Sequence, residues 1–86
     1  MDKKKEKKVK YLSEIIIFDS EERIRILKNI EEHLHGPNWS AYYGSRIVLE
    51  KEYAIGIEND NMINALYVFK LLCLYKDKEV KLTKIV

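Results

Sequence analysis

The order of hydrophobic and polar residues predicts alternating strands and helices along one short chain. Residues 9–18 end in the run IIIF at 15–18, and three adjacent β-branched residues favour a strand. Because apolar residues occupy successive positions there, we expect both faces of this strand to be buried near its end. Asp19 or Ser20 can cap a following helix, and Glu22 stands three residues after Asp19, as in a capping box.

A first helix is predicted after this cap. Its apolar residues recur at helical spacing with charges between them, at Ile24, Leu27, Ile30 and Leu34. Gly36 and Pro37 end the helix. The segment 38–45 contains Trp39, Tyr42 and Tyr43 and is expected to be a loop or an irregular entry to a strand. These aromatic side chains could stack on exposed bases, but capping a small core or filling an interface pocket is the favoured interpretation.

A hairpin is predicted next from two strand-like runs, residues 45–50 and 53–58, joined by a short polar link. In the second run, Tyr53, Ile55 and Ile57 share one face. We expect the polar pair at 51–52 to form a tight turn, although it lacks the usual Asn-Gly chemistry. Gly56, inside the second strand, indicates a bulge or a close backbone approach.

The most informative segment is 62–75, which follows the capping cluster 59–61. Between Ala65 and Tyr75 the only charged residue is Lys70. A helix that packs on one sheet needs one apolar stripe, whereas this segment is apolar almost all round. We therefore expect a second subunit or a partner protein to cover it. The predicted interface comprises Met62, Leu66, Tyr67, Phe69, Lys70, Cys73 and Leu74.

The element order β-α-β-β-α predicts an α+β sandwich, with a three-stranded antiparallel sheet and two helices on one face. Residues 80–86 are compatible with either an extra C-terminal strand or a tail. We expect one α+β domain over 9–86, preceded by a disordered basic tail at 1–8. With 86 residues, 47% hydrophobic and 35% charged, the composition is that of a globular domain. A chain this short buries a limited core, so a partner is plausible.

The net charge of +2 is distributed unevenly. Residues 1–10 hold six lysines against two acids, residues 76–86 hold four lysines against two acids, and the stretch between is acidic by four charges. The tail lysines are Lys3, Lys4, Lys5, Lys7, Lys8 and Lys10. They could contact the phosphates of a nucleic acid such as tRNA, or they could only keep the domain soluble. Both interpretations stay open.

Candidate chemistry is sparse, and we predict a non-enzyme with no catalytic residues, no cofactor and no metal. There is no glycine-rich phosphate loop. His33 and His35 diverge on a helix, where surface imidazoles near the C-terminus are the favoured interpretation. Cys73 is expected to be a buried, inert thiol. The paired carboxylates at 21/22, 31/32 and 50/52 are expected to lie on solvated helix or turn faces.

One cysteine excludes an internal disulfide framework, and no apolar run reaches the ~18 residues of a membrane span. No secretory signal is evident, so a cytoplasmic protein without membrane contact is expected.

From about residue 9 to 75 the chain resembles the small Pcc-type subunit of the KEOPS complex, which makes threonylcarbamoyladenosine in the tRNA of archaea and eukaryotes. The family phrase F-P-S-E-E after the first strand corresponds to FDSEE at 18–22. The second hairpin strand runs into I-x-I-x-x-x-D or I-E-A-x-D in the family and resembles IGIEND at 55–60, where Asp60 comes one position earlier than in the first phrase. The leucine- and alanine-rich start of the last helix corresponds to 64–66. The family phrases L-R-A and N-S-x-L-R are absent, since 66–68 reads LYV and 70–72 reads KLL.

The resemblance implies a non-catalytic subunit that supports assembly and tRNA binding. The departures suit a diverged paralogue that pairs with the ordinary small subunit, the catalytic transferase subunit, or both, as a homodimer or a heterodimer. The lysine- and isoleucine-rich composition is compatible with an archaeal source. Two alternatives stay open. The chain could be a small nucleic-acid-binding protein that uses its lysine tail, or a phage or mobile-element protein that inhibits a host target through the same helix.

Overall fold

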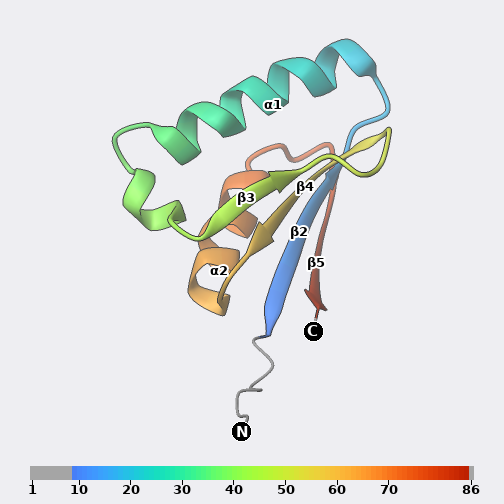
Figure 1. Ribbon diagram of the computed structural model, residues 1–86. Helices are drawn as coiled ribbons and strands as arrows, with labels where there is room; N and C mark the ends of the chain where they lie inside the picture. The colour runs from blue at the N-terminus through green and yellow to red at the C-terminus, as the bar shows by residue number, and fades with distance from the viewer. Residues whose placement is uncertain (1–8, 86) are drawn as a thin grey trace, which may run out of the picture.

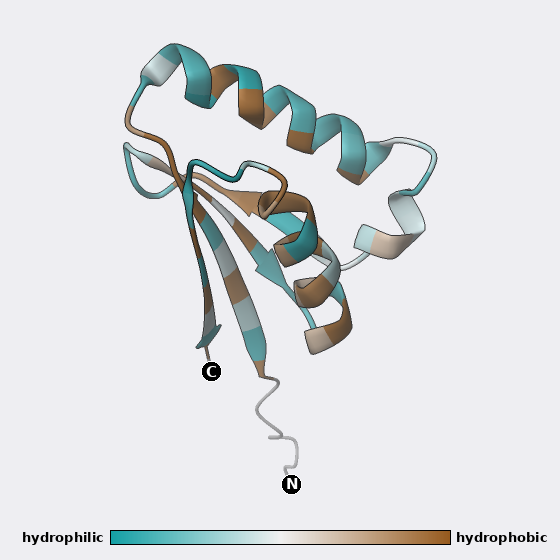
Figure 2. Cartoon of the chain, turned by 180° about the vertical axis from the view of Figure 1, so that it is seen from behind, coloured by the Kyte–Doolittle hydropathy of each residue, from teal (hydrophilic) through white to brown (hydrophobic). Residues whose placement is uncertain are grey.

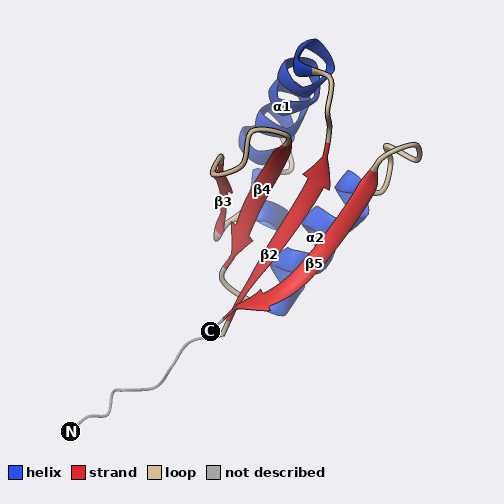
Figure 3. Ribbon diagram, turned by 90° about the vertical axis from the view of Figure 1, so that its right-hand side faces the viewer, coloured by secondary structure: helices blue, strands red, loops and turns tan. Residues whose placement is uncertain are grey.

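Four strands form one antiparallel sheet in the order β3-β4-β2-β5, and both helices cover the same side of it (Figures 1 and 3). The computed structural model describes residues 9–85, so the predicted tail at 1–8 lies outside the described residues. The elements in chain order are β2 (Lys10–Ile16), α1 (Ser20–His35), the 3-10 helix η1 (Trp39–Tyr42), β3 (Ser45–Val48), β4 (Ala54–Asn59), α2 (Met62–Leu72) and β5 (Glu79–Ile85). The predicted α+β class is confirmed.

The C-terminal segment, which the sequence left open, is a full strand. Along its whole length β5 pairs antiparallel with β2, from Lys10 opposite Ile85 to Ile16 opposite Glu79. The sheet therefore has four strands rather than three, and β2 lies inside it with β4 on its other side. This inner position explains why β2 ends in adjacent buried isoleucines, Ile15 and Ile16.

The core lies between the sheet and the two helices. The strand register places Ile15 opposite Ile55, and Ile57 next to Ile47, all on the helix side. Ile30 from α1 and other residues of both helices complete this cluster. Each fully buried isoleucine contributes about 1.5–3 kcal/mol relative to an exposed one. The predicted burial of both faces is confirmed for Ile15, Ile16 and Ile17, but Phe18, the last residue of the predicted run, is 80% exposed.

Both helices begin where the sequence predicts. The Asp19 carboxylate accepts the backbone N–H of Glu22 at 2.8 Å, and Gly36 follows the last residue of α1. The Glu22 carboxylate pairs with Lys78 at 2.8 Å. At α2, the Asn61 side chain accepts the N–H of Asn64 at 2.9 Å. Each cap satisfies a backbone donor that the first helical turn leaves without a partner.

The predicted tight turn at 51–52 is wrong. β3 ends at Val48 and β4 begins at Ala54, so residues 49–53 form a longer loop. A two-residue hairpin turn needs residues with positive φ, and among the described residues only Gly44 has one. Tyr53 lies in this loop rather than in the strand. Its carbonyl accepts the N–H of Ile17 at 2.8 Å, and its ring stacks on Phe18 with centroids 5.5 Å apart.

Gly56 marks a close backbone approach and not a bulge. The register runs through it without interruption, with Glu14 on one side and Val48 on the other. A Cβ at this position would lie 3.0 Å from the carbonyl oxygen of Val48. Glycine therefore allows β3 to lie close against β4 at this point.

A buried asparagine joins three strands at one end of the sheet. The Asn59 amide donates to the Ser13 hydroxyl at 3.1 Å and to the carbonyls of Tyr11 and Ile57. Its side-chain oxygen accepts the hydroxyl proton of Ser45 at 2.8 Å. Because Ser13 and Asn59 are fully buried, these hydrogen bonds offset the cost of taking polar groups out of water.

Candidate protein-interaction surface

α2 has two apolar faces, only one of which is covered by this chain. The inner face packs on the sheet and consists of Asn64, Ala65, Val68, Leu71 and Leu72. The opposite face, called here the outer α2 face, consists of Ile63, Leu66, Tyr67, Lys70 and Leu74, and all five are exposed. Hydrophobic residues recur along α2 in Figure 2. An exposed apolar stripe at helical spacing is typical of a protein-binding surface.

The seven residues predicted as an interface divide unevenly around α2. Six of them are exposed: Met62, Leu66, Tyr67, Lys70, Cys73 and Leu74. Phe69 is half-buried, because it points toward β5 and borders a hollow there with Val80. The prediction omitted Ile63, of which 67% is exposed. Its position four residues before Tyr67 and three before Leu66 is the signal that could have included it.

Cys73 corrects a second expectation, since it is exposed and not buried. It is the C-cap of α2, one position past the last residue of the inner face. One helical step of about 100° past Leu72 turns this side chain away from the sheet-facing side, so the apolar surroundings of Cys73 in sequence did not predict its exposure.

The outer α2 face carries a shallow hollow of about 330 Å³ lined by Ile63, Leu66, Tyr67 and Lys70. The only charge in its lining is the Lys70 ammonium. The aliphatic stem of a lysine can lie along apolar surface while its charged end reaches water. The hollow therefore suits an apolar side chain of a partner with a carboxylate close by.

Aromatic residues of η1 border α2. Tyr42 meets Tyr67 edge to face, with centroids 6.4 Å apart. The Asn64 amide donates to the carbonyl of Ala41 at 3.1 Å, which fixes η1 against the helix. Trp39 and Tyr43 form their own edge-to-face pair at 6.1 Å and are exposed. The predicted aromatic cluster thus divides, with Tyr42 partly buried against the core and the other two at the surface.

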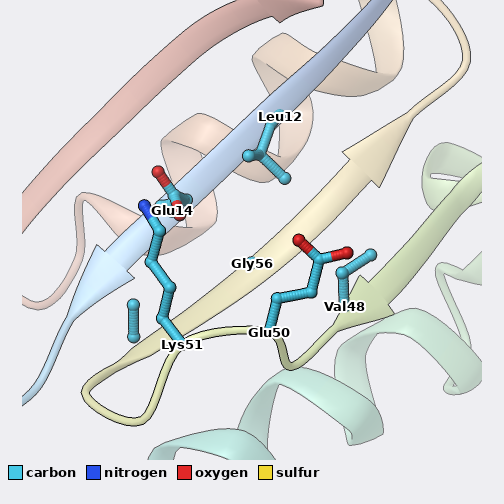
Figure 4. Close-up of a pocket in the computed structure, with 7 residues that line it drawn as sticks. Leu12, Glu14, Val48, Glu50, Lys51 and Gly56 are labelled. Carbon is cyan, nitrogen blue, oxygen red and sulfur yellow. Dashed lines mark ion pairs between the residues drawn. The ribbon is translucent and has the colours of Figure 1, made fainter.

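The side of the sheet away from the helices has a small cavity of about 50 Å³ above Gly56 (Figure 4). Leu12, Val48 and Ala54 also line it. Lys51 reaches across from the 49–53 loop to the Glu14 carboxylate at 3.0 Å, and this hydrogen bond raises the pKa of Lys51. Small-molecule sites usually measure about 300–1,000 Å³, so the cavity admits water and not an organic ligand.

Charged side chains on this open side are paired with one another. The Arg46 guanidinium donates to Glu58 at 2.8 Å and to Asp60 at 2.9 Å. These hydrogen bonds, first of all the one to Asp60, raise the pKa of Arg46. Lys10 lies 3.9 Å from Glu58. The pairing leaves little net field to attract a charged ligand to this face.

Of the predicted nucleic-acid-binding lysines, only Lys10 is described. Lys3, Lys4, Lys5, Lys7 and Lys8 lie outside the described residues. The register places Lys10 opposite Ile85 and Tyr11 opposite Lys84. Lys10 and Lys84 therefore lie on neighbouring strands where β2 begins and β5 ends (Figure 1), whereas Lys76 and Lys78 precede β5 at the other end of the sheet.

The remaining candidates do not form a cluster. His33 places its Nδ1 2.9 Å from the carbonyl oxygen of Asn29, one turn earlier in α1. Within residues 9–85, no three His, Cys, Asp or Glu side chains are grouped so that they could hold a metal ion. Neither helix of this part of the chain has the length and apolar content that a membrane crossing requires.

Comparison with known proteins found no matching protein family, no matching curated protein and no matching solved structure. The fold and the surface thus define a small α+β domain with an apolar helix face open to a partner, and the resemblance to Pcc-type subunits stays a prediction.

Proposed function

We propose that this chain is a non-catalytic subunit that binds a partner protein through the outer α2 face. The observation that carries the proposal is the exposure of Ile63, Leu66 and Tyr67 on one side of α2, and of Leu74 just past its end, while the other side of α2 is in the core. Covering these side chains removes apolar surface from water, which is the main favourable contribution to most protein association.

The chemistry of this face specifies the kind of partner. Lys70 is the only charged residue of the five, so a partner that brings a carboxylate to it gains charge complementarity. An amphipathic helix with an apolar stripe can lie along α2 in the way that helices fill hydrophobic grooves. A face only eleven residues long is small beside the ~800 Å² per partner of a standard interface, so a partner must also contact neighbouring surface. The exposed Trp39 and Tyr43 offer such surface.

The specific form of the proposal is a KEOPS-like subunit that pairs with another small subunit or with the threonylcarbamoyl-transferase subunit in the cytoplasm. The element order β-α-β-β-α and the phrase at 18–22 support it by resemblance. The extra strand β5 follows the segment that resembles the family, so it is compatible with a diverged paralogue.

Contact with tRNA is a second candidate role, favoured by Lys10 and Lys84, which lie on neighbouring strands beside the start of β2. Lysines that gather at one pole of a domain can follow a phosphate backbone, with an affinity that falls as salt rises. Deleting residues 1–8 should then weaken RNA binding and flatten its salt dependence, whereas an unchanged affinity would reject this role.

Affinity purification from the protein's own cells tests the main proposal. The wild-type chain is compared with Ile63→Glu on the outer α2 face and with Ile24→Glu on α1. Both isoleucines are exposed helix residues, at 67% and 58%, so the two variants carry the same chemical change at different places. The proposal is supported if Ile63→Glu loses the partner and Ile24→Glu retains it. Retention of the partner by both variants contradicts it. Recovery of a transferase subunit supports the KEOPS-like form.

A further inference from the structure

β5 is an edge strand with one side unpaired by any described strand of this chain. It runs for seven residues, Glu79–Ile85, and contains neither proline nor glycine. The other edge strand, β3, has only four residues, and such a short strand offers few backbone groups for pairing with another chain. We propose that β5 pairs antiparallel with β5 of a second copy, which joins two sheets into one of eight strands.

The direction of the side chains restricts the register of this pairing. Val80, Leu82 and Lys84 share the helix side, because they lie opposite Ile15, Ser13 and Tyr11 in β2. In a continuous sheet, residues directly opposite each other point to the same face. In the joined sheet, the helices of both copies lie on the same side. The two-fold axis must therefore lie midway between the two copies of one residue. An axis at Leu82 pairs all seven residues of β5.

In this register, Leu82 meets Leu82 of the second copy, Val80 meets Lys84, and Lys81 meets Thr83. No two like charges lie directly opposite each other, an arrangement that would be destabilising. With the axis at Lys81, the two copies of Lys81 would lie directly opposite each other. With the axis at Thr83, fewer residues would pair and Leu82 would lie opposite Lys84. The β5 sequence is thus complementary to itself in the register that pairs the whole strand.

Packing on the helix side agrees with this arrangement. Val80 and Leu82 are only half-buried, since each lacks a neighbouring strand on one side. Val80 also borders a hollow of about 360 Å³ with Phe69 and Cys73 of α2. The stem of Lys84 from the second copy would lie against Val80 at the mouth of this hollow. None of the residues named for this pairing belongs to the outer α2 face.

Substitution of Thr83 tests the pairing with matched changes. Thr83 is exposed, so replacing it leaves the core intact. Thr83→Lys places a second cation opposite Lys81, at two symmetry-related contacts, and should weaken dimerisation on the order of tenfold. Thr83→Glu should strengthen it several-fold, and Thr83→Gln should change it little. Sedimentation equilibrium gives the dissociation constants. A monomeric wild-type protein at its highest soluble concentration, or equal constants for Lys and Glu, overturns the proposal.

A cross-linking pair tests the register directly in a Cys73→Ser background. Directly opposite Cβ atoms lie about 5 Å apart, so Leu82→Cys should form an intermolecular disulfide under mild oxidation. The two copies of Val80 lie four residues apart along the strands, about 13 Å, so Val80→Cys should not. Equal cross-linking of both, or of neither, contradicts the register. Ile63→Glu should leave the dimer intact, so that a failure of partner binding and a failure of dimerisation are distinguished.

Discussion

The ring of Tyr67 on α2 lies edge to face against the ring of Tyr42 in η1, with centroids 6.4 Å apart and planes inclined by 73°. This contact joins the short 3-10 helix to the exposed side of α2. The hydrogen bond from the Asn64 amide to the carbonyl of Ala41 also holds η1 against α2. The outer α2 face and the aromatic residues of η1 therefore form neighbouring parts of one surface.

A double-mutant cycle should measure the Tyr42–Tyr67 contact. We expect a coupling free energy of about 0.5–1 kcal/mol between Tyr42→Leu and Tyr67→Leu in urea unfolding, because edge-to-face pairs stabilise beyond their buried area. The matched cycle with Tyr43→Leu should give no coupling to Tyr67, since Tyr43 pairs with Trp39. Additive effects of Tyr42→Leu and Tyr67→Leu would show that the contact does not form.

Replacing the buried Asn59 should destabilise the domain strongly. Asn59→Ala leaves the buried Ser13 hydroxyl without one partner and removes the acceptor of the Ser45 hydroxyl. We expect a loss of about 2–3 kcal/mol in the free energy of unfolding. The control is Asn29→Ala on the exposed side of α1, with an expected change below about 0.5 kcal/mol. Similar losses for the two variants would contradict the role of Asn59.

The ion pairs of Lys78 should make stability depend on pH at both ends of the scale. The hydrogen bond from Lys78 lowers the pKa of Asp77 below its ordinary 3.8, and hydrogen bonds to Glu22 and Asp77 raise the pKa of Lys78 above its ordinary 10.5. The stabilisation from Asp77 is present above pH 3.8 and is lost as pH falls through the lowered pKa. The stabilisation from Lys78 is full below pH 10.5 and is lost as pH rises through the raised pKa.

Melting temperatures of wild type and Lys78→Gln across pH check this. The difference between the two proteins should be largest near neutral pH and shrink toward acid and alkali. Lys28→Gln, at an exposed lysine of α1, serves as the control. A difference that stays constant over the whole range would rule out the assigned ion pairs.

The exposed Cys73 thiol should react with a thiol reagent in the native protein, without denaturant, because it lies at the surface beside the outer α2 face. A bound partner should slow the reaction by covering this side of α2. A thiol that reacts only in urea would show that Cys73 is buried in the native protein, which would contradict the orientation of α2.

Local chemistry predicted most of the fold. Asp19 and Asn61 cap the helices as their positions indicate, and the isoleucine run predicts a strand that is buried on both faces near its end. These features depend on neighbours within a few residues, which a sequence displays directly. The 49–53 loop did not follow from the sequence, because the hydrogen bond from Ile17 to Tyr53 that shapes it joins distant segments.

The candidate surface could be predicted only in part. An almost wholly apolar helix carries no periodic signal for the side that faces the sheet, so its rotation depends on packing against residues such as Ile15 and Ile57. For this reason Phe69 proved half-buried and Ile63 exposed, although the apolar excess of α2 was evident from the sequence alone.

The central claim is that the outer α2 face binds a partner protein, and paired purification of Ile63→Glu and Ile24→Glu from native cells tests it most directly. The account predicts that Ile24→Glu retains the partner of the wild-type chain and that Ile63→Glu loses it while keeping its native circular dichroism. Undiminished recovery of the same partner with folded Ile63→Glu would contradict the claim.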